Sequence, residues 1–344
     1  MEYINDINIQ EAVIHVLDSN SGEPILNEYK LEINEDVYKY LYNHIEKSLK
    51  SEDLKYAKFN EERNIVKEVV QDYLNGLDSN LIGLSQELAR QLFIRMKTNI
   101  NIPSCDLIIV SLITDQGPMM GILKLDYKKS FIHQIDFSEN KVGVDLVAQA
   151  TGLPASSQRI EKAAFIKPIR ENADFDLLVL DKKKKKSDDE EYGSNYWINN
   201  FLGCIQVTNE RDETRNFINL SERWIRQTYP DDAVESESMR REIRKQLEEN
   251  ETININEFAE EIIKEDGFAD NFKMFMSGHV DGEIKIDKVY AEKKLNKIKL
   301  KIDKDIEINI GKEAYEDLSR FEISKNGDGS INMTIKNVVN YIEK

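Results

Sequence analysis

Lysines concentrate in the segment from residue 285 to residue 301. Seven of them occur there against two acidic residues, which gives the segment a net charge of +5. Three of these lysines, Lys297, Lys299 and Lys301, alternate with large aliphatic residues, as in a half-buried strand. Because side chains two residues apart point to the same side of a strand, we expect one basic face that could lie along a phosphate backbone. Any exposed sheet face also needs charge, and lysines at its edge discourage aggregation, so an ordinary surface is the alternative.

A second basic group lies beside the apolar stripe of a predicted helix over residues 239–247. Its arginines cover one arc of this helix, but Glu248 falls within the same arc and further acidic residues border it. Ion pairs between neighbouring turns favour a salt-bridged surface here, with phosphate contact as the alternative. The candidate DNA-contacting residues are Lys293, Lys294, Lys297, Lys299 and Lys301, with Arg240, Arg241 and Arg244 second.

The sequence carries no recognisable signature of catalysis, of a cofactor or of a bound metal. None of the four histidines has another histidine, a cysteine or a carboxylate at metal-ligand spacing. No glycine-rich phosphate loop occurs, and the string from Asn326 to Ser330 lacks the later glutamate of a calcium loop, so it predicts a hairpin turn. We therefore expect no catalytic, cofactor-binding or metal-binding residue. A metal-dependent nuclease that uses scattered carboxylates is the remaining enzymatic alternative.

The chain as a whole is acidic. Its 344 residues carry 64 acidic and 47 basic side chains, a net charge of −17, and 40% of them are hydrophobic, which is enough for a buried core. This balance excludes a protein that is basic all over and coats nucleic acid. The acidic side chains are also concentrated in one segment, since residues 231–270 alone carry a net charge of −9. Such a surface repels DNA and favours a basic protein partner, unless it serves only solubility.

The N-terminus and the cysteines indicate an intracellular protein. The first residues lack the basic and apolar regions of a signal peptide, and no apolar run approaches the roughly 20 residues that span a bilayer. The two cysteines, Cys105 and Cys204, lie beside apolar runs and are expected to be buried free thiols. We expect a cytoplasmic location and no membrane partner.

The first half of the chain predicts helices followed by an antiparallel sheet. Short connections rich in turn residues separate several strand-like runs, and parallel neighbours would need longer crossovers. Such an arrangement is an α+β fold in which the helices cover the sheet. The expected strands are 7–17, 29–33, 106–114, 119–126, 130–137, 163–168 and 175–181, and the expected helices are 35–50, 61–75 and 85–97.

A block of charge separates the two halves. Five lysines and four acidic residues fill most of residues 182–191 without an apolar interruption, which predicts a solvated loop. After it, helical spacing dominates up to about residue 275, including a helix near 255–263 capped by Asn256. Alternating segments between residues 283 and 335 then predict a small antiparallel sheet. We therefore expect an α+β fold of two domains, each combining helices with a mainly antiparallel β-sheet: residues 1–181 and 195–344, joined by a charged linker at 182–194.

Several strings of the sequence, taken together, resemble those of one bacterial family. They are residues 163–168 (AAFIKP), the turn at residues 201–204 (FLGC) after an aromatic-rich helix, and the run from Phe321 to Ser330. The strand that carries His15 and the passage from strand to helix near residues 31–36 fit the same pattern. Over essentially the whole chain, the sequence resembles the nucleoid-associated proteins of the NdpA/YejK type. The resemblance implies a cytoplasmic, nucleoid-associated protein that binds DNA, and it brings no enzymatic residues with it.

The sequence supports two functional hypotheses. In the first, the chain is a nucleoid-associated protein, not an enzyme, that binds double-stranded DNA through a localised basic face with little sequence preference. In the second, it is an acidic adaptor that a basic DNA-associated protein recruits to the nucleoid. A homodimer is plausible in the first case, because two chains would combine their phosphate contacts.

Overall fold

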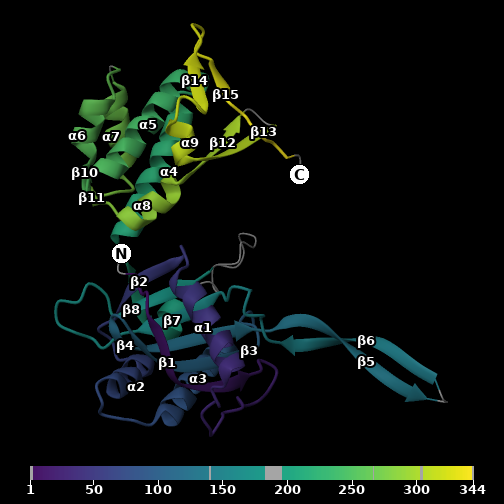
Figure 1. Cartoon of the computed structure of the whole chain (residues 1–344). Helices are drawn as coiled ribbons and strands as arrows, with labels where there is room; N and C mark the ends of the chain where they lie inside the picture. The colour runs from purple at the N-terminus through teal and green to yellow at the C-terminus, as the bar shows by residue number, and fades with distance from the viewer. Residues whose placement is uncertain (1–2, 139–140, 183–195, 266, 303–304, 343–344) are drawn as a thin grey trace. The chain divides into compact units, whose positions relative to one another are not determined.

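The computed structural model describes residues 3–138, 141–182, 196–265, 267–302 and 305–342 (Figure 1). Its elements form an α+β fold with mainly antiparallel strand pairing, which confirms the predicted fold class. The chain divides into two compact units, Glu2–Val207 and Thr208–Lys344. None of the described helices is both long enough and apolar enough to cross a membrane.

The N-terminal unit is built on an antiparallel sheet in the order β1-β3-β4-β7-β8-β2-β9. Leu107 and Ile109 of β3 pack with α2, α3 and the short helix η1, while Ile108 and Val110 on the opposite face are also buried. A strand that is buried on both faces reads as a continuous apolar run, which is how the sequence revealed it. The strands are β1 (Ile7–Leu17), β2 (Leu54–Phe59), β3 (Cys105–Thr114), β4 (Gly117–Asp126), β7 (Lys162–Ile166), β8 (Leu177–Asp181) and β9 (Cys204–Val207).

Helices pack against this sheet as expected. Asn34 caps α1, since its side chain accepts a hydrogen bond from the Val37 N–H at 3.0 Å. Cys105 and Cys204 are buried free thiols, as predicted, and burial raises the pKa of each to about 12. The helices are α1 (Glu35–Leu49), α2 (Ile65–Leu74), α3 (Leu81–Thr98) and η1 (Tyr196–Leu202), and the hairpin β5 (Lys128–Ser138) with β6 (Lys141–Gly152) completes the unit.

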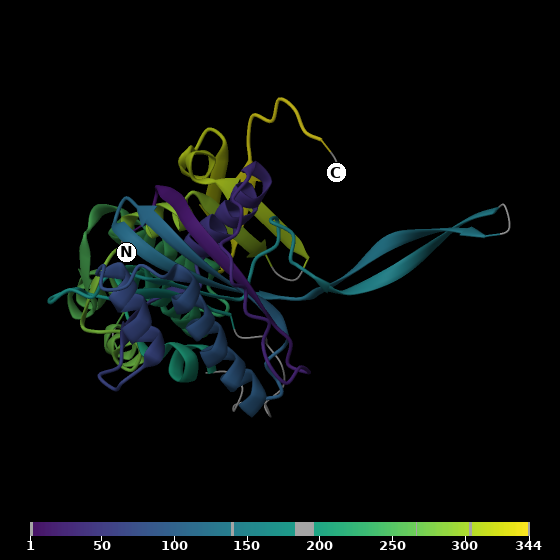
Figure 2. The ribbon, with the colours of Figure 1, turned by 90° about the horizontal axis from the view of Figure 1, so that it is seen from below.

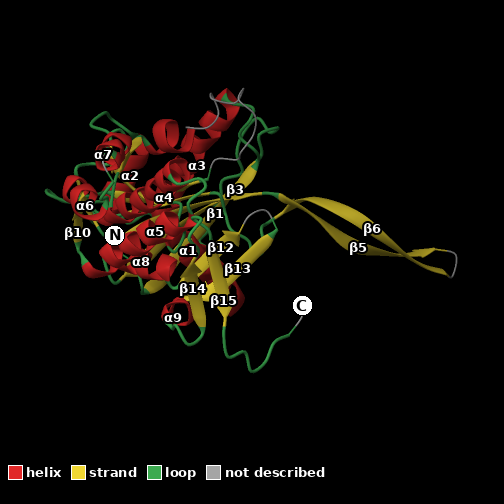
Figure 3. Cartoon of the chain, turned by 90° about the horizontal axis from the view of Figure 1, so that it is seen from above, coloured by secondary structure: helices red, strands yellow, loops and turns green. Residues whose placement is uncertain are grey.

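The C-terminal unit combines helices with short hairpins. Its core gathers around Trp224 and Phe272, whose rings meet edge to face with centroids 5.0 Å apart. Figure 3 shows the hairpins β12–β13 and β14–β15 beside α9. The helices are α4 (Glu210–Thr228), α5 (Ala233–Glu249), α6 (Ile255–Ile262), α7 (Phe268–Ser277), α8 (Lys288–Leu295) and α9 (Lys312–Glu316), and the strands are β10 (Thr252–Asn254), β11 (Glu283–Lys285), β12 (Lys297–Ile302), β13 (Ile306–Gly311), β14 (Phe321–Lys325) and β15 (Ile331–Ile335).

Two expected strand arrangements are wrong. Residues 29–33 form no strand, because the segment makes only one backbone bond to its neighbour, from Leu31 to Ala12, and Tyr29 is 76% exposed. In place of the single sheet expected after residue 283, the described part of the chain has the two hairpins β12–β13 and β14–β15, while β11 pairs with β10, which lies upstream of α6 and α7. Alternation reveals a strand but not its partner, because pairing depends on contacts distant in sequence.

One helix cap differs from expectation, whereas one predicted turn is confirmed. The cap of α6 is Asn254, not Asn256, because the Asn254 side chain accepts from the backbone N–H groups of residues 256 and 257. Residues 326–330 do form the turn between β14 and β15, as predicted, closed by a bond from the Asn326 N–H to the Ser330 carbonyl at 2.8 Å.

The boundary between the units lies later than the charge block. Residues 196–207 were expected in the second domain, but they form η1 and β9, and β9 pairs with β2 in the N-terminal sheet. Trp197 and Phe201 are fully buried in that core, which fixes the segment to the first unit. The elements before and after the charge block in the sequence, β8 and η1, therefore both belong to the first unit. Lys182 is described, and residues 183–194 of the expected linker, together with residue 195, lie outside the described ranges.

Candidate nucleic-acid interface

The row of lysines on β12 is positioned by its pairing with β13. Pairing runs without a shift from Lys297 opposite Gly311 to Ile302 opposite Ile306. On one face of β12, Ile298 is buried and packs with Tyr315. The other face presents Lys297, Lys299 and Lys301, all exposed, to solvent. Within the described residues none of these three lysines forms an ion pair, although Glu307 on β13 lies opposite Lys301.

Helix α8 brings two more lysines to the start of this row. Asp287 caps the helix by accepting a bond from the Tyr290 N–H at 3.0 Å. Lys293 and Lys294 are exposed in its last turn, where positive charge is favoured by the helix dipole. The Lys294 Nζ lies 5.4 Å from the centre of the Tyr290 ring. Because only Asn296 separates α8 from β12, the five lysines follow one another closely along the backbone.

Most of the candidate residues line a single groove, called here the basic groove, within the C-terminal unit. It has a volume of about 1340 Å³ and lies among α4, α5, the end of α8 and the hairpins β12–β13 and β14–β15. Lys293 and Arg241 are the two candidates that do not line it. Arg226 also lines the groove, although it was not among the candidates from the sequence. It lies four residues after Glu222, and this spacing could have indicated an ion pair on one helix face. The charged lining residues are Arg226, Arg240, Arg244, Lys294, Lys297, Lys299 and Lys301, against Glu222 and Glu237.

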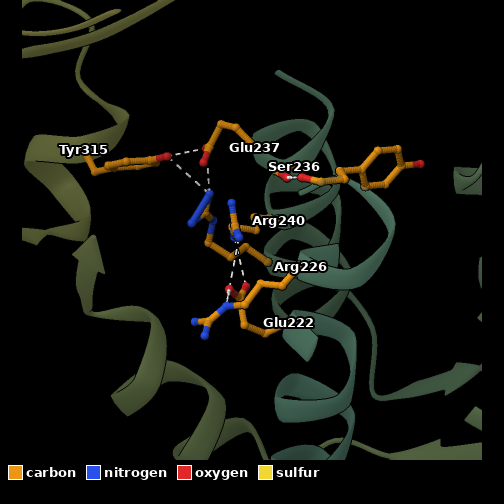
Figure 4. Close-up of polar contacts among 8 residues, drawn as sticks. Glu222, Arg226, Ser236, Glu237, Arg240 and Tyr315 are labelled. Carbon is orange, nitrogen blue, oxygen red and sulfur yellow. Dashed lines mark hydrogen bonds and ion pairs between the residues drawn. The ribbon is translucent and has the colours of Figure 1, made fainter. Parts of the chain in front are cut away.

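The arginines of the groove differ from its lysines in having carboxylate partners. Arg240 on α5 holds Glu222 on α4 in a two-point contact, with nitrogen–oxygen distances of 2.9 and 3.0 Å (Figure 4). Arg226 donates to the same carboxylate at 2.8 Å. Burial favours the protonated form of Glu222, but the hydrogen bonds from the two arginines outweigh it, so the pKa of Glu222 is lowered. Arg240 therefore joins two helices and offers only part of its guanidinium to a ligand.

A second polar cluster involves Glu237 on α5. Its carboxylate accepts from Arg244 at 2.8 Å and from Arg241 at 3.2 Å. It also accepts from the hydroxyl of Tyr315 on α9 (Figure 4). The guanidinium of Arg244 also lies over the Tyr315 ring, 5.0 Å from its centre. The salt-bridged surface that the sequence favoured for this helix is thus present. Among the eight candidate residues, the five lysines of α8 and β12 are exposed, whereas Arg240 and Arg244 are only partly exposed and are held by carboxylates.

Replacing Glu222 by glutamine tests the structural role of its arginine contacts. We expect Glu222→Gln to lower the free energy of unfolding of the C-terminal unit by about 1–3 kcal/mol at pH 7, because the three charge-assisted bonds from Arg240 and Arg226 weaken. Since the folded-state pKa is depressed, the stabilisation is complete above the unfolded value of about 4.5 and is lost as pH falls through the folded value. The difference in free energy of unfolding between wild type and variant, measured by urea unfolding, should therefore become smaller below pH 4.5. Glu242→Gln on α5 is the control, and an equal effect there would contradict the assignment.

Helix α6, in the acidic segment 231–270, contributes no residue to the lining of the basic groove. Helix α6 buries Phe258 and Ala259 and exposes Glu257, Glu260 and Glu261. Lys273 pairs with Glu260 at 2.8 Å, while Glu257 and Glu261 have no ion-pair partner among the residues that the structure describes. A patch of this kind would attract a basic ligand.

A buried serine–histidine pair occurs in the N-terminal unit. His15 Nδ1 accepts from the Asn27 N–H at 3.0 Å, so Nε2 carries the proton and donates to Ser85 Oγ at 2.9 Å. Ser85 in turn donates to the Ile82 carbonyl at 2.8 Å. Burial, followed by the charge of Arg90, lowers the pKa of His15 to about 4. The bond between histidine and serine runs in the wrong direction for a base that activates a nucleophile, and the pair ties α3 to β1.

Comparison with known proteins identifies one family. A family model described as nucleoid-associated protein YejK matches residues 13–343, which is nearly the whole chain and includes every candidate residue. No curated protein matches the chain.

Proposed function

This chain belongs to the family of nucleoid-associated protein YejK, and we propose that it binds double-stranded DNA directly through the basic groove and the adjoining lysines. The observation that supports this most is the contrast in charge. Seven basic and two acidic side chains line the groove, in a chain whose net charge is −17. Such a local excess attracts phosphates although the whole molecule is acidic. The cytoplasmic nucleoid is the location we propose.

The chemistry of the groove fits contact with the DNA backbone rather than with base edges. Lys297, Lys299 and Lys301 present flexible point charges, which bind phosphates without reading sequence. Arg240 and Arg244, the side chains suited to recognising a guanine edge, are already engaged by carboxylates. Sequence-independent binding is the expected consequence.

Direct binding is tested with the purified chain and fluorescent duplexes of unrelated sequence. We expect fluorescence anisotropy to report binding of both duplexes in low salt, with dissociation constants within about threefold of each other, because phosphate contacts carry no sequence information. A preference of 1000-fold or more, which is in the range of specific binders, would overturn the proposed mode of recognition.

A homodimer is the state that we propose for DNA binding. Five exposed lysines on one chain form a modest patch, and two linked patches bind one duplex with higher avidity than either alone. Two-fold symmetry also suits the pseudo-symmetric backbone of a duplex.

An acidic adaptor is the second candidate function. The exposed carboxylates of Glu257, Glu260 and Glu261 on α6 favour it, because they would attract a basic DNA-associated protein. Replacing all three with glutamine separates the hypotheses. The adaptor requires nucleoid co-purification that survives nuclease treatment in the wild type and is lost in this variant, whereas direct binding is unaffected by it.

The family description names association with the nucleoid and no reaction, which supports a non-enzymatic role. The metal-dependent nuclease considered above is tested by incubating the chain with DNA and magnesium or manganese ions. Turnover in that assay, above that of a mock purification, would overturn the non-enzymatic role.

A further inference from the structure

The hairpin β5–β6, residues 128–152, is the arm of the N-terminal unit. Figures 1 and 2 show it extending away from the sheet and helices of that unit. Its strands pair in register from Ser130 opposite Gln149 to Ser138 opposite Lys141. Among the described elements, β5 and β6 pack extensively only against each other. A two-stranded ribbon alone is marginally stable in water, so we expect this arm to be stabilised by packing against another surface.

The two faces of the arm differ sharply in chemistry. Register and alternation place six large apolar side chains on one face, together with His133 and Ala148, and we call this the apolar arm face. The opposite face is polar except for Ile132 and Val147, which lie across from each other. The exposed fractions on the apolar arm face are 61% for Phe131, 48% for Ile135, 79% for Phe137, 64% for Val142, 65% for Val144 and 78% for Leu146.

The chemistry of the apolar arm face does not suit DNA as its occupant. None of its eight side chains is a lysine, an arginine, an aspartate or a glutamate. Lys129, whose Nζ lies 5.5 Å from the centre of the Phe131 ring, adds one positive charge beside six large apolar side chains. A ribbon that enters a DNA groove neutralises phosphates with several basic side chains. A contiguous apolar surface of this size instead marks a protein interface.

We propose that the apolar arm face is the surface through which two copies of this chain dimerise, arm against arm. In a two-fold dimer the same patch meets itself, so the patch must be complementary to its own copy. An uncharged apolar face meets this condition, whereas two chains of net charge −17 repel each other over most of their surfaces. This proposal refines the homodimer of the proposed function and does not depend on DNA binding.

The exposed area agrees with a dimer interface of ordinary size. Side chains of this size, exposed to these fractions, each leave on the order of 100 Å² accessible. Six of them present about 600 Å² per copy, close to the ~800 Å² that each partner contributes to a standard interface. Face-to-face packing would bury both apolar faces and leave the polar faces in water, as in the two layers of a sandwich.

Two isoleucines of the same strand provide a matched test. Ile135 lies on the apolar arm face and is 48% exposed, while Ile132 lies on the polar face and is 51% exposed. Light scattering on the full chain should give a mass of about 80 kDa, twice the 39.9 kDa of one copy. Ile135→Asp should raise the dimer dissociation constant by about 100-fold, as expected for a buried interface residue, and Ile132→Asp by less than threefold. Circular dichroism of both variants should match wild type, since the arm packs extensively only on itself.

Disulfide cross-linking gives an independent readout. The two natural cysteines are buried, so a cysteine placed at His133 on the apolar arm face is readily oxidised only if a second copy lies close. We expect a cross-linked dimer with His133→Cys and none with Gln134→Cys on the opposite face.

Three outcomes would each overturn the proposal. They are a wild-type chain that stays monomeric at 100 µM, equal effects of the two aspartate variants, and equal cross-linking at both positions. DNA anisotropy on Ile135→Asp separates this outcome from failure of the DNA-binding proposal, because a monomer with intact lysines still binds, more weakly.

Discussion

Replacing Lys297, Lys299 and Lys301 together by glutamate is expected to weaken binding of duplex DNA by about 100-fold or more in 0.1 M salt. Each phosphate contact contributes roughly 0.9 to the slope of log affinity against log salt, so three lost contacts remove about 500-fold at this salt relative to 1 M. All three lysines are exposed on one face of β12 and have no ion-pair partner in the described ranges, so their reversal breaks no ion pair. Anisotropy with a labelled duplex measures the loss.

A control variant with the same change in net charge separates the role of position from that of total charge. Lys39, Lys245 and Lys264 are exposed lysines outside the basic groove, and their joint replacement by glutamate also takes the chain from −17 to about −23. We expect this control to bind DNA within about tenfold of wild type. Equal losses in both variants would mean that net charge, and not the face on β12, governs binding.

Truncating Trp224 to alanine is expected to destabilise the C-terminal unit by about 3–5 kcal/mol, the usual cost of deleting a fully buried aromatic side chain. Trp224 is 1% exposed, its indole N–H donates to Asn271 Oδ1 at 2.8 Å, and its ring meets Tyr229 and Phe272 edge to face. The melting temperature of this unit should fall by on the order of 10–20 °C.

Calorimetry of this variant also tests the proposal that the two units are independent domains. Trp197 is fully buried in the N-terminal core, so each unit has its own tryptophan. We expect Trp224→Ala to shift one of two transitions and Trp197→Ala to shift the other. A single transition that both variants shift equally would contradict two independent domains.

Local patterns predicted most elements, because the apolar period reports which side of an element is buried. The run from Asp106 to Thr114 was recognisable as a strand, and the alternation at 297–302 placed three lysines on one face before any pairing was known. The structure of short, partly polar segments was harder to predict. The strand expected at 29–33 alternates in the same way, yet it lies over β1 with a single backbone bond and its tyrosine remains in solvent.

What the sequence could not reveal depends on contacts distant along the chain. Nothing local shows that Arg240 meets Glu222, 18 residues earlier and on another helix, or that Tyr315 reaches Glu237. The arm was also missed as a unit. Val142, Val144 and Leu146 of β6 alternate as in a strand, but alternation does not show that β6 pairs with β5 and gathers the apolar residues of both strands on one face. The charge block suggested a domain boundary, whereas the buried aromatic residues after it belong to the first core.

The salt dependence of DNA binding by the wild-type chain tests the central claim most directly. If the five exposed lysines of α8 and β12 each neutralise a phosphate, a plot of log affinity against log salt should have a slope of about −4.5 for one copy, and a steeper one if two copies engage the same duplex. Undetectable binding in 50 mM salt, or an affinity that stays constant between 50 and 200 mM salt, would contradict a DNA-binding protein that acts through this basic face.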